Sequence, residues 1–344
     1  MGKLALVCLL AGAIPAAPAD EPALARYEFL RVEMAVPIKI VLYAADEATA
    51  GEAARAAFGR IHELDGILSD YDPESELRRL CRDSGEGRPV RVSDELWHVL
   101  NQAQALSERS GGAFDVTIGP VVRLWRRARR RTEMPSPEQL AAARRLVGHR
   151  LVRLDPEHQA VELAVRGMRL DLGGIAKGYA VDEALAVLRN RGITRALVDA
   201  GGDIALGDPP PDKPGWLIGV ASLEPEAPPS RYLWLSRLAI ATSGDTWQYV
   251  EIGGRRYSHL VDPRTGLGLT DHSSVTVIAP NCTAADSLAS AVSVLGPDKG
   301  LKLIEETPGA AAFIVRAPEG AVEVRESCRW KEFPVAKPEE AGEK

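Results

Sequence analysis

The stretch DLGGIAKGY at residues 171–179 decides the type of fold, because an apolar segment passes through a glycine-rich turn directly into helical spacing. Before the turn, Val161–Val165 and Arg169–Leu172 have the composition of a hairpin pair. After it, Tyr179–Asn190 is expected to be a helix and Arg195–Asp199 a buried strand. Helices and strands that mix without a regular strand–helix–strand alternation predict an α+β fold rather than a doubly wound sheet.

The same mixture extends from this turn toward both ends of the chain. On the N-terminal side we expect one strand and three helices, at Glu33–Tyr43, Asp46–Leu68, Glu95–Ser107 and after Glu138. On the C-terminal side we expect one helix, Ala284–Leu295, and strands at Trp216–Ala221, Tyr232–Ala241, Ser274–Ala279, Ala311–Val315 and Ala321–Val324. No repeat or clean linker interrupts the pattern, so residues 20–335 are expected to form one large domain of mixed sheets and packed helices with two subregions, followed by a disordered tail at 336–344.

The N-terminus has the pattern of a secretory signal peptide. A short charged start precedes the apolar run Leu4–Ile14, and Ala17-Pro18-Ala19 is a small-x-small cleavage pattern, so residues 1–19 are expected to be removed. A membrane anchor is the alternative, but the run is shorter than the ~18 apolar residues that span a bilayer. We therefore expect an exported, periplasmic protein with no stable membrane insertion.

Composition excludes several classes of protein. The 344 residues include 42 Lys plus Arg and 48 Asp plus Glu, a formal net charge of -6, with 45% hydrophobic residues. This balance is unlike a disordered chain, and it lacks the basic surface of a nucleic-acid-binding protein. Beyond the leader, Cys81, Cys282 and Cys328 have no metal-type spacing; one disulfide plus a free thiol is allowed, and the sequence does not choose the pair. The six arginines of Arg123–Arg131 are interpreted as a solvated helix face rather than an anion-binding patch.

Two glycine-rich turns carry candidate chemistry. In the 171–179 stretch, backbone N–H groups at a helix N-terminus and Lys177 are placed to meet phosphate, although a tight turn with a surface lysine is an equal alternative. The spacing matches neither the Walker A nor the GxGxxG motif. In Asp199–Ile204 a strand ends in two glycines, and there we favour a turn in which Asp203 accepts backbone N–H groups.

Two later segments supply a candidate base and a candidate cation site. His259 could act as a general base, and Ser243-Gly244 could donate hydrogen bonds to a phosphate; a structural histidine is the alternative. Asp286 and Ser290 are four residues apart on a predicted helix, so their oxygens share one face, as a hard cation requires. Mg²⁺ suits this set better than Zn²⁺ does, with a helix-capping role for Asp286 as the alternative. Together these features suit transfer at a pyrophosphate.

The chain resembles the ApbE-type FAD:protein FMN transferases, also called flavin transferases, from about Met34 to Gly296. Seven segments match in order: Leu64–Leu77, Gly112–Pro120, Asp171–Asp182, Asp199–Asp203, Thr242–Gly244, His259–Gly266 and Ala285–Gly296. The resemblance implies that FAD binds and that its FMN half is transferred, with Mg²⁺, to a Thr or Ser hydroxyl of an exported flavoprotein, releasing AMP.

The resemblance also implies roles for particular residues. His259 would be the base that activates the acceptor hydroxyl, and the metal would be held by the Gly174 carbonyl and the side chains of Asp286 and Ser290. The flavin contacts would be Met34, Tyr71 as a stacking ring, Ala113, Phe114, Asp115, Asp171, Lys177 and Leu260.

The chain departs from the family pattern at three of these places. Met34-Ala35-Val36 replaces the usual Met-Gly-Thr, Ser290 replaces a common threonine, and Ala289 stands where some members have a second acid. Two other functions use the same site: a Mg²⁺-dependent FAD pyrophosphatase that gives FMN and AMP, and an exported flavin-binding protein without catalysis. The intact His259, Asp286 and Lys177 favour an enzyme, but the sequence does not separate transferase from hydrolase.

Overall fold

The computed structural model describes residues 23–85, 87–224, 227–246 and 248–337. The predicted leader at residues 1–19 and most of the predicted tail lie outside these ranges, so both stay predictions. Within the described part, no helix has the length and apolar character needed to cross a bilayer.

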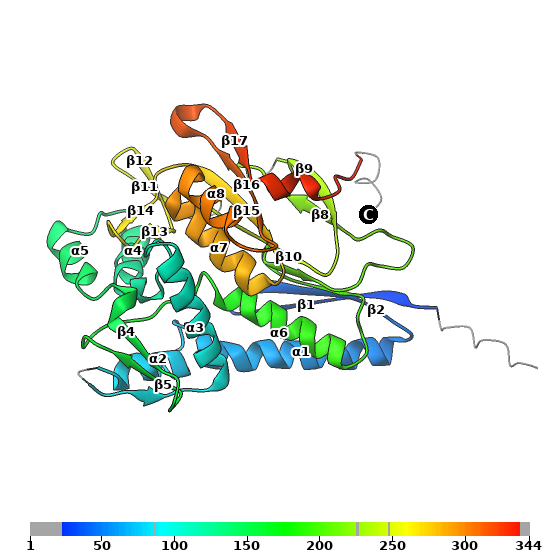
Figure 1. Ribbon diagram of the computed structural model, residues 1–344, viewed down its shortest axis with the longest axis horizontal. Coiled ribbons are helices and arrows are strands. Elements are labelled where there is room, and N and C mark those ends of the chain that lie inside the picture. Colours follow the sequence, from blue (N-terminus) through cyan, green and yellow to red (C-terminus); the bar gives the residue numbers. More distant parts are fainter. Residues whose placement is uncertain (1–22, 86, 225–226, 247, 338–344) are drawn as a thin grey trace, which may run out of the picture.

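An eight-stranded sheet forms the centre, and every neighbouring pair in it is antiparallel (Figure 1). In spatial order its strands are β1 (Ala25–Glu33), β2 (Val36–Ala44), β6 (Ala196–Ala200), β7 (Ile204–Leu206), β10 (Ala239–Gly244), β15 (Ser273–Ala279), β16 (Ala311–Arg316) and β17 (Glu323–Glu326). The hairpin near the N-terminus therefore lies beside strands that are about 150 residues further along the chain.

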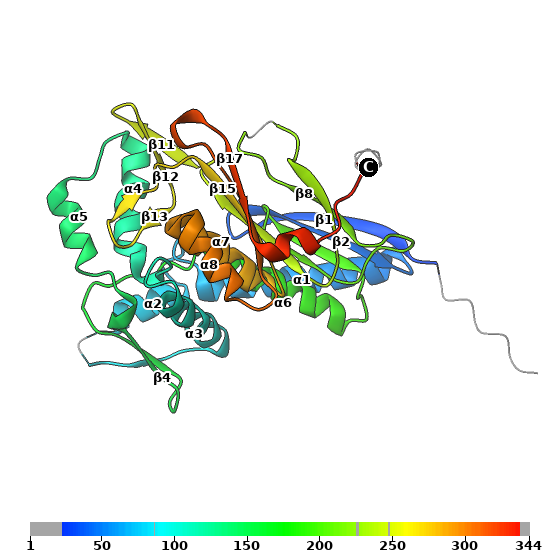
Figure 2. The same ribbon diagram turned by 45° about the horizontal axis from the view of Figure 1, so that its top comes forward.

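Helices cover one face of this sheet. Because strand side chains alternate between faces, Ile38, Ile40 and Leu42 of β2 point into the helix-covered core, whereas Val41 points to the other side. Three helices pack there (Figure 2), with α6 between the other two (Figure 1): α1 (Glu47–Leu68), α6 (Ala176–Asn190) and α7 (Cys282–Leu295). The remaining helices are α2 (Glu76–Asp83), α3 (Asp94–Arg109), α4 (Gly119–Arg131), α5 (Pro137–Arg144) and α8 (Pro297–Glu305), with short 3₁₀ turns at Val116–Ile118, His149–Leu151, Pro318–Gly320 and Cys328–Glu332.

Smaller sheets surround this body. The opposite face of the large sheet is covered by the hairpin of β8 (Trp216–Val220) and β9 (Arg231–Leu235) together with Trp330. The other short strands are β3 (Val90–Arg91), β4 (Val152–Asp155), β5 (Ala160–Leu163), β11 (Tyr249–Ile252), β12 (Arg255–Ser258), β13 (Val261–Asp262) and β14 (Leu267–Gly268).

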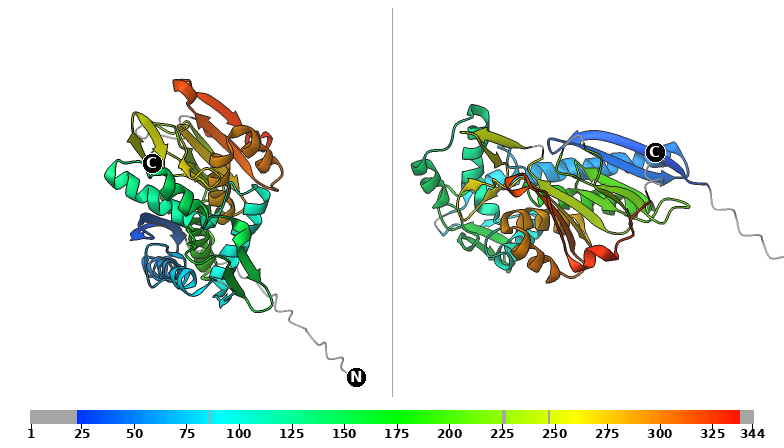
Figure 3. Two further views of the ribbon diagram at one scale, coloured as in Figure 1. Left: turned by 90° about the vertical axis from the view of Figure 1, so that its left-hand side faces the viewer. Right: turned by 90° about the horizontal axis from the view of Figure 1, so that it is seen from above.

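A second subregion has its own small core. Helices α4 and α5 lie beside the β11–β12 hairpin at one end of the molecule (Figure 3), around buried Val121, Trp125 and Val250. The indole N–H of Trp125 donates to the carbonyl of Gly266, 2.8 Å away, and so ties α4 to the loop between β13 and β14. The α+β class and the division into two subregions are confirmed.

Most predicted elements are present, but one hairpin prediction is wrong. Strand β5 pairs with β4 and β3, and Arg169–Leu172 forms no strand. Its alternating apolar residues, Leu170 and Leu172, are buried without a ladder partner, and the Asp171 N–H donates to the Val116 carbonyl at 2.8 Å. Here, burial of every second residue gives the alternating apolar pattern of a strand although the backbone is not paired in a sheet. Cys81, Cys282 and Cys328 are free thiols, so the described cysteines form no disulfide.

Candidate active site

Three charged side chains meet where α6 and α7 approach each other; we call Lys177, Asp203 and Asp286 the lysine cluster. Lys177, in the first turn of α6, forms an ion pair with Asp203, which lies between β6 and β7. Asp286 of α7 accepts a hydrogen bond from the Gly178 N–H at 3.1 Å. The interpretation of Asp203 as a turn acceptor is wrong, because Asp199 accepts the Gly202 N–H at 2.9 Å and Asp203 is left to pair with the lysine.

The glycines of the 171–179 stretch allow this approach. A Cβ on Gly178 would lie 2.3 Å from the Cys282 carbonyl oxygen, a distance that no side chain tolerates. A Cβ on Gly174 would lie 2.9 Å from Ser290 Oγ and 3.3 Å from the Phe114 ring. The glycines therefore bring α6, α7 and the Phe114 loop into direct contact.

The charges of the lysine cluster depend on one another. Burial alone would favour a neutral amine, but the carboxylates of Asp286 and Asp203 outweigh it and raise the pKa of Lys177 above its usual value. Burial, and then the neighbouring Asp203, raise the pKa of Asp286 to about 7. A second cation close to Asp286 would reverse that rise and hold the carboxylate ionised.

Oxygen donors surround Asp286. Ser290 Oγ, one turn further along α7, lies 3.3 Å from Ser243 Oγ of β10, and the backbone of Gly174 lies against Ser290. Gly244, next to Ser243, is as closely packed: its Cβ would lie 2.4 Å from the Ser273 carbonyl oxygen. In the described ranges no group of three or more His, Cys, Asp or Glu side chains is placed to bind a metal. The oxygens placed here are the Asp286 carboxylate and the hydroxyls of Ser290 and Ser243, ligand types that a hard cation accepts.

His259 lies between β12 and β13, and one of its ring nitrogens is hydrogen-bonded to the backbone. Its Nδ1 is 3.2 Å from the Gln248 carbonyl oxygen, which also accepts the His259 backbone N–H at 3.0 Å. A carbonyl only accepts, so Nδ1 carries the proton and Nε2 keeps a free lone pair. Burial lowers the pKa of His259 to about 4, and the positive charges of Arg129 and Lys177 add to the effect. The ring is therefore a neutral acceptor at physiological pH.

A second cluster, the tyrosine platform, contains Tyr71, Asp70, Arg126 and Asp171. The Arg126 guanidinium lies 4.2 Å from the centre of the Tyr71 ring and donates to Asp70 at 2.5 Å and to Asp171 at 3.0 Å. Tyr71 itself is 70% exposed. The interpretation of the whole arginine run as a solvated face is wrong for Arg126, because this side chain turns inward from α4 to meet two carboxylates.

The other predicted flavin contacts lie around these clusters. Ala113 and Phe114 are buried, and Asp115 directs one carboxylate oxygen to the Thr117 N–H at 2.9 Å and the other to the His149 N–H at 2.8 Å. Met34 is at the tip of the β1–β2 hairpin, and Leu260 follows His259. The Asp115 carboxylate is thus engaged both by its own turn and by the 3₁₀ turn at His149–Leu151.

Sequence reasoning missed three charged residues of this region. Asp203 and Arg126 belong to the two clusters, and Arg129 donates to the Gln248 side-chain oxygen at 3.2 Å beside His259. Arg126 and Arg129 are three residues apart, which places them on one face of α4, and this spacing is a signal that the sequence does contain.

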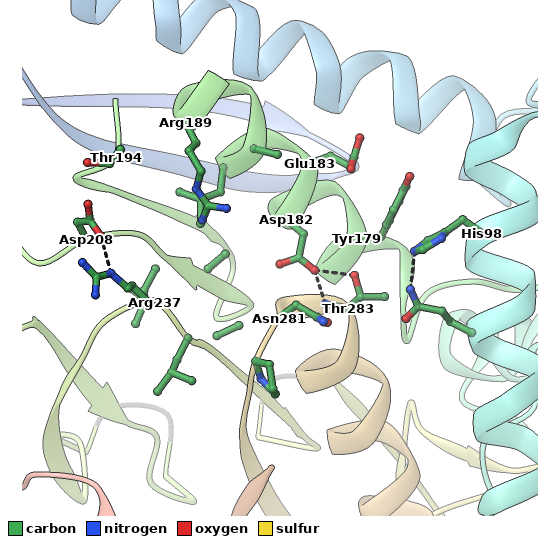
Figure 4. Close-up of a pocket in the computed structure, with 18 residues that line it drawn as sticks. His98, Tyr179, Asp182, Glu183, Arg189, Thr194, Asp208, Arg237, Asn281 and Thr283 are labelled. Atoms are coloured by element: carbon green, nitrogen blue, oxygen red, sulfur yellow. Dashed lines mark hydrogen bonds and ion pairs between the residues drawn. The ribbon is translucent and has the colours of Figure 1, made fainter. Parts of the chain in front are cut away.

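A cavity of about 640 Å³ lies elsewhere, lined by residues of α6, α3, β7, β10 and the start of α7 (Figure 4). Asp182 is among its lining residues, and its carboxylate accepts the Thr283 N–H and hydroxyl at 2.8 and 2.6 Å, so the acid caps the start of α7. None of the predicted site residues lines this cavity. The candidate active site is therefore the region between the two clusters and His259.

Comparison with known proteins points to one family. The model of the ApbE family matches residues 34–314. The FAD:protein FMN transferase of Haemophilus influenzae is 34% identical over 270 residues, 76% of this chain and 78% of that protein. The protein of the same name from Treponema pallidum is 34% identical over 287 residues, with coverages of 77% and 79%.

Solved structures extend the likeness to the fold. The flavin transferase ApbE from Vibrio cholerae gives a TM-score of 0.81 at 27% identity, over 91% of this chain and 100% of that chain. The ApbE protein from Thermotoga maritima gives 0.80 at 30% identity, over 90% and 99%. Since the family match spans most of the sequence, and two relatives exceed 30% identity across three quarters of it, this chain belongs to the ApbE family.

Proposed function

We propose that this protein is an FAD:protein FMN transferase that moves the FMN half of FAD to a Thr or Ser hydroxyl of an exported flavoprotein and releases AMP. The observation that carries the proposal is the position of a neutral histidine near the lysine cluster, in a chain whose relatives bear that enzyme name. The residues present are those that transfer at a pyrophosphate needs: a base, buried positive charge and oxygen donors for a cation.

His259 acts as the base in this proposal. Its Nε2 takes the proton of the acceptor hydroxyl as that oxygen attacks the phosphorus of the FMN half. The bond from this phosphorus to the bridging oxygen breaks, and AMP leaves with that oxygen. The hydrogen bond of Nδ1 to the Gln248 carbonyl keeps the proton off Nε2 before the reaction.

The lysine cluster binds the phosphates in this proposal. Lys177 provides an ammonium whose charge is maintained by Asp203, and Asp286, Ser290 and the Gly174 carbonyl would hold Mg²⁺. A Mg²⁺ ion bound there would supply positive charge to the pyrophosphate oxygens. Tyr71, on the other side of the site, offers an exposed ring to the isoalloxazine.

The experiment is to incubate the mature protein with FAD, Mg²⁺ and an acceptor that carries a flavinylation sequence, and then to measure the acceptor mass. Covalent gain of one FMN supports transfer. Free FMN and AMP with an unmodified acceptor would indicate a pyrophosphatase, and tight FAD binding without turnover would indicate a carrier.

Two variants test the assigned residues in this assay. Asp286→Ala should abolish metal-dependent turnover, and Asp298→Ala, at an exposed acid of α8, is the matched control. His259→Ala should slow transfer by roughly 10²-fold or more while FAD still binds. Wild-type rates in either variant would remove that residue from the mechanism.

We also propose that residues 1–19 are a cleaved leader and that the mature protein acts in the periplasm. The apolar run Leu4–Ile14 and the Ala17-Pro18-Ala19 pattern support this. The mass of the protein recovered from a periplasmic fraction tests it: a chain that still starts at Met1 would contradict cleavage.

A further inference from the structure

Arg126 connects three segments that are far apart in the sequence. It belongs to α4, Asp70 and Tyr71 follow the end of α1, and Asp171 precedes α6. The guanidinium side chain is 21% exposed and the two carboxylate side chains 16% and 10%, so the ion pairs are largely shielded from water. A planar guanidinium can bind two carboxylates and still present a face to an aromatic ring.

The tyrosine ring is fixed on one side only. The Arg126 guanidinium lies against one face of Tyr71 at 4.2 Å, and yet the residue is 70% exposed, so the other face is open. Backbone N–H groups of Tyr71 and Asp72 also point to the Ser69 hydroxyl, each at 3.4 Å. An aromatic ring with one face packed against a cation and the other face exposed is preorganised to stack on a planar ligand.

Removing the guanidinium would release this arrangement. Asp70 and Asp171 would then face each other without a cation, and their repulsion would push apart the segments that carry them. Asp171 is anchored by its N–H bond to the Val116 carbonyl and by accepting the Gly173 N–H at 2.9 Å. The segment of Asp70 and Tyr71 lies on the surface and is the one expected to move.

We propose that Arg126 is a positioning residue for the flavin ring: it holds Tyr71 in the orientation that stacks on the isoalloxazine. This rests on the proposed function, because it assumes that a flavin occupies the open face of Tyr71. Arg126 acts through Tyr71 and does not itself touch the ligand. Its guanidinium is engaged by Asp70, Asp171 and the Tyr71 ring, so no role in phosphate binding is assigned to it.

The test separates the flavin end of the ligand from the nucleotide end. Riboflavin and AMP are titrated separately against wild type, Arg126→Met, Arg126→Lys and Tyr71→Ala, with flavin fluorescence quenching as the readout of stacking. Arg127→Met, on the exposed neighbour in α4, is the matched control. We expect Arg126→Met to bind riboflavin roughly tenfold more weakly with reduced quenching, AMP affinity to stay the same, and Arg126→Lys to be intermediate.

A double variant tests whether Arg126 acts through the ring. Arg126→Met added to Tyr71→Ala should weaken riboflavin binding no further, because the ring that the arginine holds is already gone. Wild-type riboflavin affinity in Arg126→Met, or an equal loss of riboflavin and AMP affinity with a lowered melting temperature, would overturn the proposal. No binding of FAD or riboflavin by the wild type would instead overturn the proposed function on which it rests.

Discussion

The two clusters of the candidate active site use opposite strategies. In the lysine cluster, one cation and two carboxylates are buried between α6 and α7, where glycines bring the backbones into contact. In the tyrosine platform, one cation also joins two shielded carboxylates, but the aromatic ring that the cation contacts stays exposed. The first arrangement can fix charge, and the second can adapt to a ligand. We call the lysine cluster the rigid end of the site and the tyrosine platform its open end.

Breaking the charge balance of the rigid end should have the largest effect on stability. Lys177→Met leaves Asp203 and Asp286 buried without their cation, and we expect a loss of about 3–5 kcal/mol in the free energy of unfolding. Chemical denaturation measures it. Arg126→Met, in the open end, should cost less, about 1–3 kcal/mol, because the segment that carries Asp70 and Tyr71 can move and expose the Asp70 carboxylate to water.

The double variant Lys177→Met/Asp203→Asn is the control for this prediction. It removes one buried negative charge together with the positive one, and it should regain part of the lost stability. Equal losses of unfolding free energy for Lys177→Met and Arg126→Met would contradict the prediction. They would mean that leaving the carboxylates without their cation costs the same in both clusters.

The close contact of α6 and α7 gives the next largest effect. Gly178→Ala places a methyl group 2.3 Å from a backbone oxygen that cannot move without its helix, so we expect a loss of about 3 kcal/mol. Gly59→Ala is the matched control, since Gly59 is also helical but has no atom within 4 Å of its Cβ position. That variant should gain about 0.5–1 kcal/mol from helix propensity. A neutral Gly178→Ala in denaturation would contradict the tight contact.

The same contrast explains which site residues could be predicted from the sequence. Lys177, Asp286 and Ser290 were recognisable because glycine spacing and helical periodicity are local signals, and they lie in the rigid end. Arg126 gave only a weak signal, its shared helix face with Arg129: its partners are 45 and 56 residues away, and an arginine among arginines is usually solvated. Asp203 was misread since its partner, Lys177, lies 26 residues upstream.

The fold shows the same limit. The helix predicted at Asp46–Leu68 matches α1 within one residue, because an N-cap and helical spacing mark it. The strand predicted at Arg169–Leu172 does not exist, because alternate burial has period two whether or not the backbone is paired. Pairing between distant segments, such as β2 with β6, has no local signal at all.

A smaller effect on stability is expected at the tip of the β1–β2 hairpin. There, two residues that are not glycine, Met34 and Ala35, adopt left-handed backbone angles. Met34 has φ of 49° and Ala35 of 62°, as the two-residue turn between β1 and β2 requires. Ala35→Gly removes the steric cost at the second position and should stabilise the protein by about 0.5–1 kcal/mol after the entropy of glycine is counted. Thermal denaturation measures it.

Ala141→Gly, at an exposed position of α5, is the matched control for the hairpin variant. It should destabilise by about the same amount, because helical alanine is unstrained. A loss of stability in both variants would mean that the left-handed angle at Ala35 costs less than the entropy of glycine.

The smallest effect is a flat pH profile from His259, which lies between the rigid and the open ends. With a pKa of about 4, rather than the ordinary 6.5, the imidazole is already deprotonated at neutral pH and loses its basic lone pair only as the pH falls through 4. Transfer at saturating FAD and acceptor should therefore change by less than about twofold between pH 8 and pH 5 through this group. Removing the nearby charge with Arg129→Met should raise the pKa and move the acid limb upward. A wild-type rate that halves near pH 6.5 at saturating Mg²⁺, with a midpoint that Arg129→Met shifts, in protein shown by circular dichroism to be folded, would mean that His259 is hydrated like a surface histidine and that the neutral base is not built into the site.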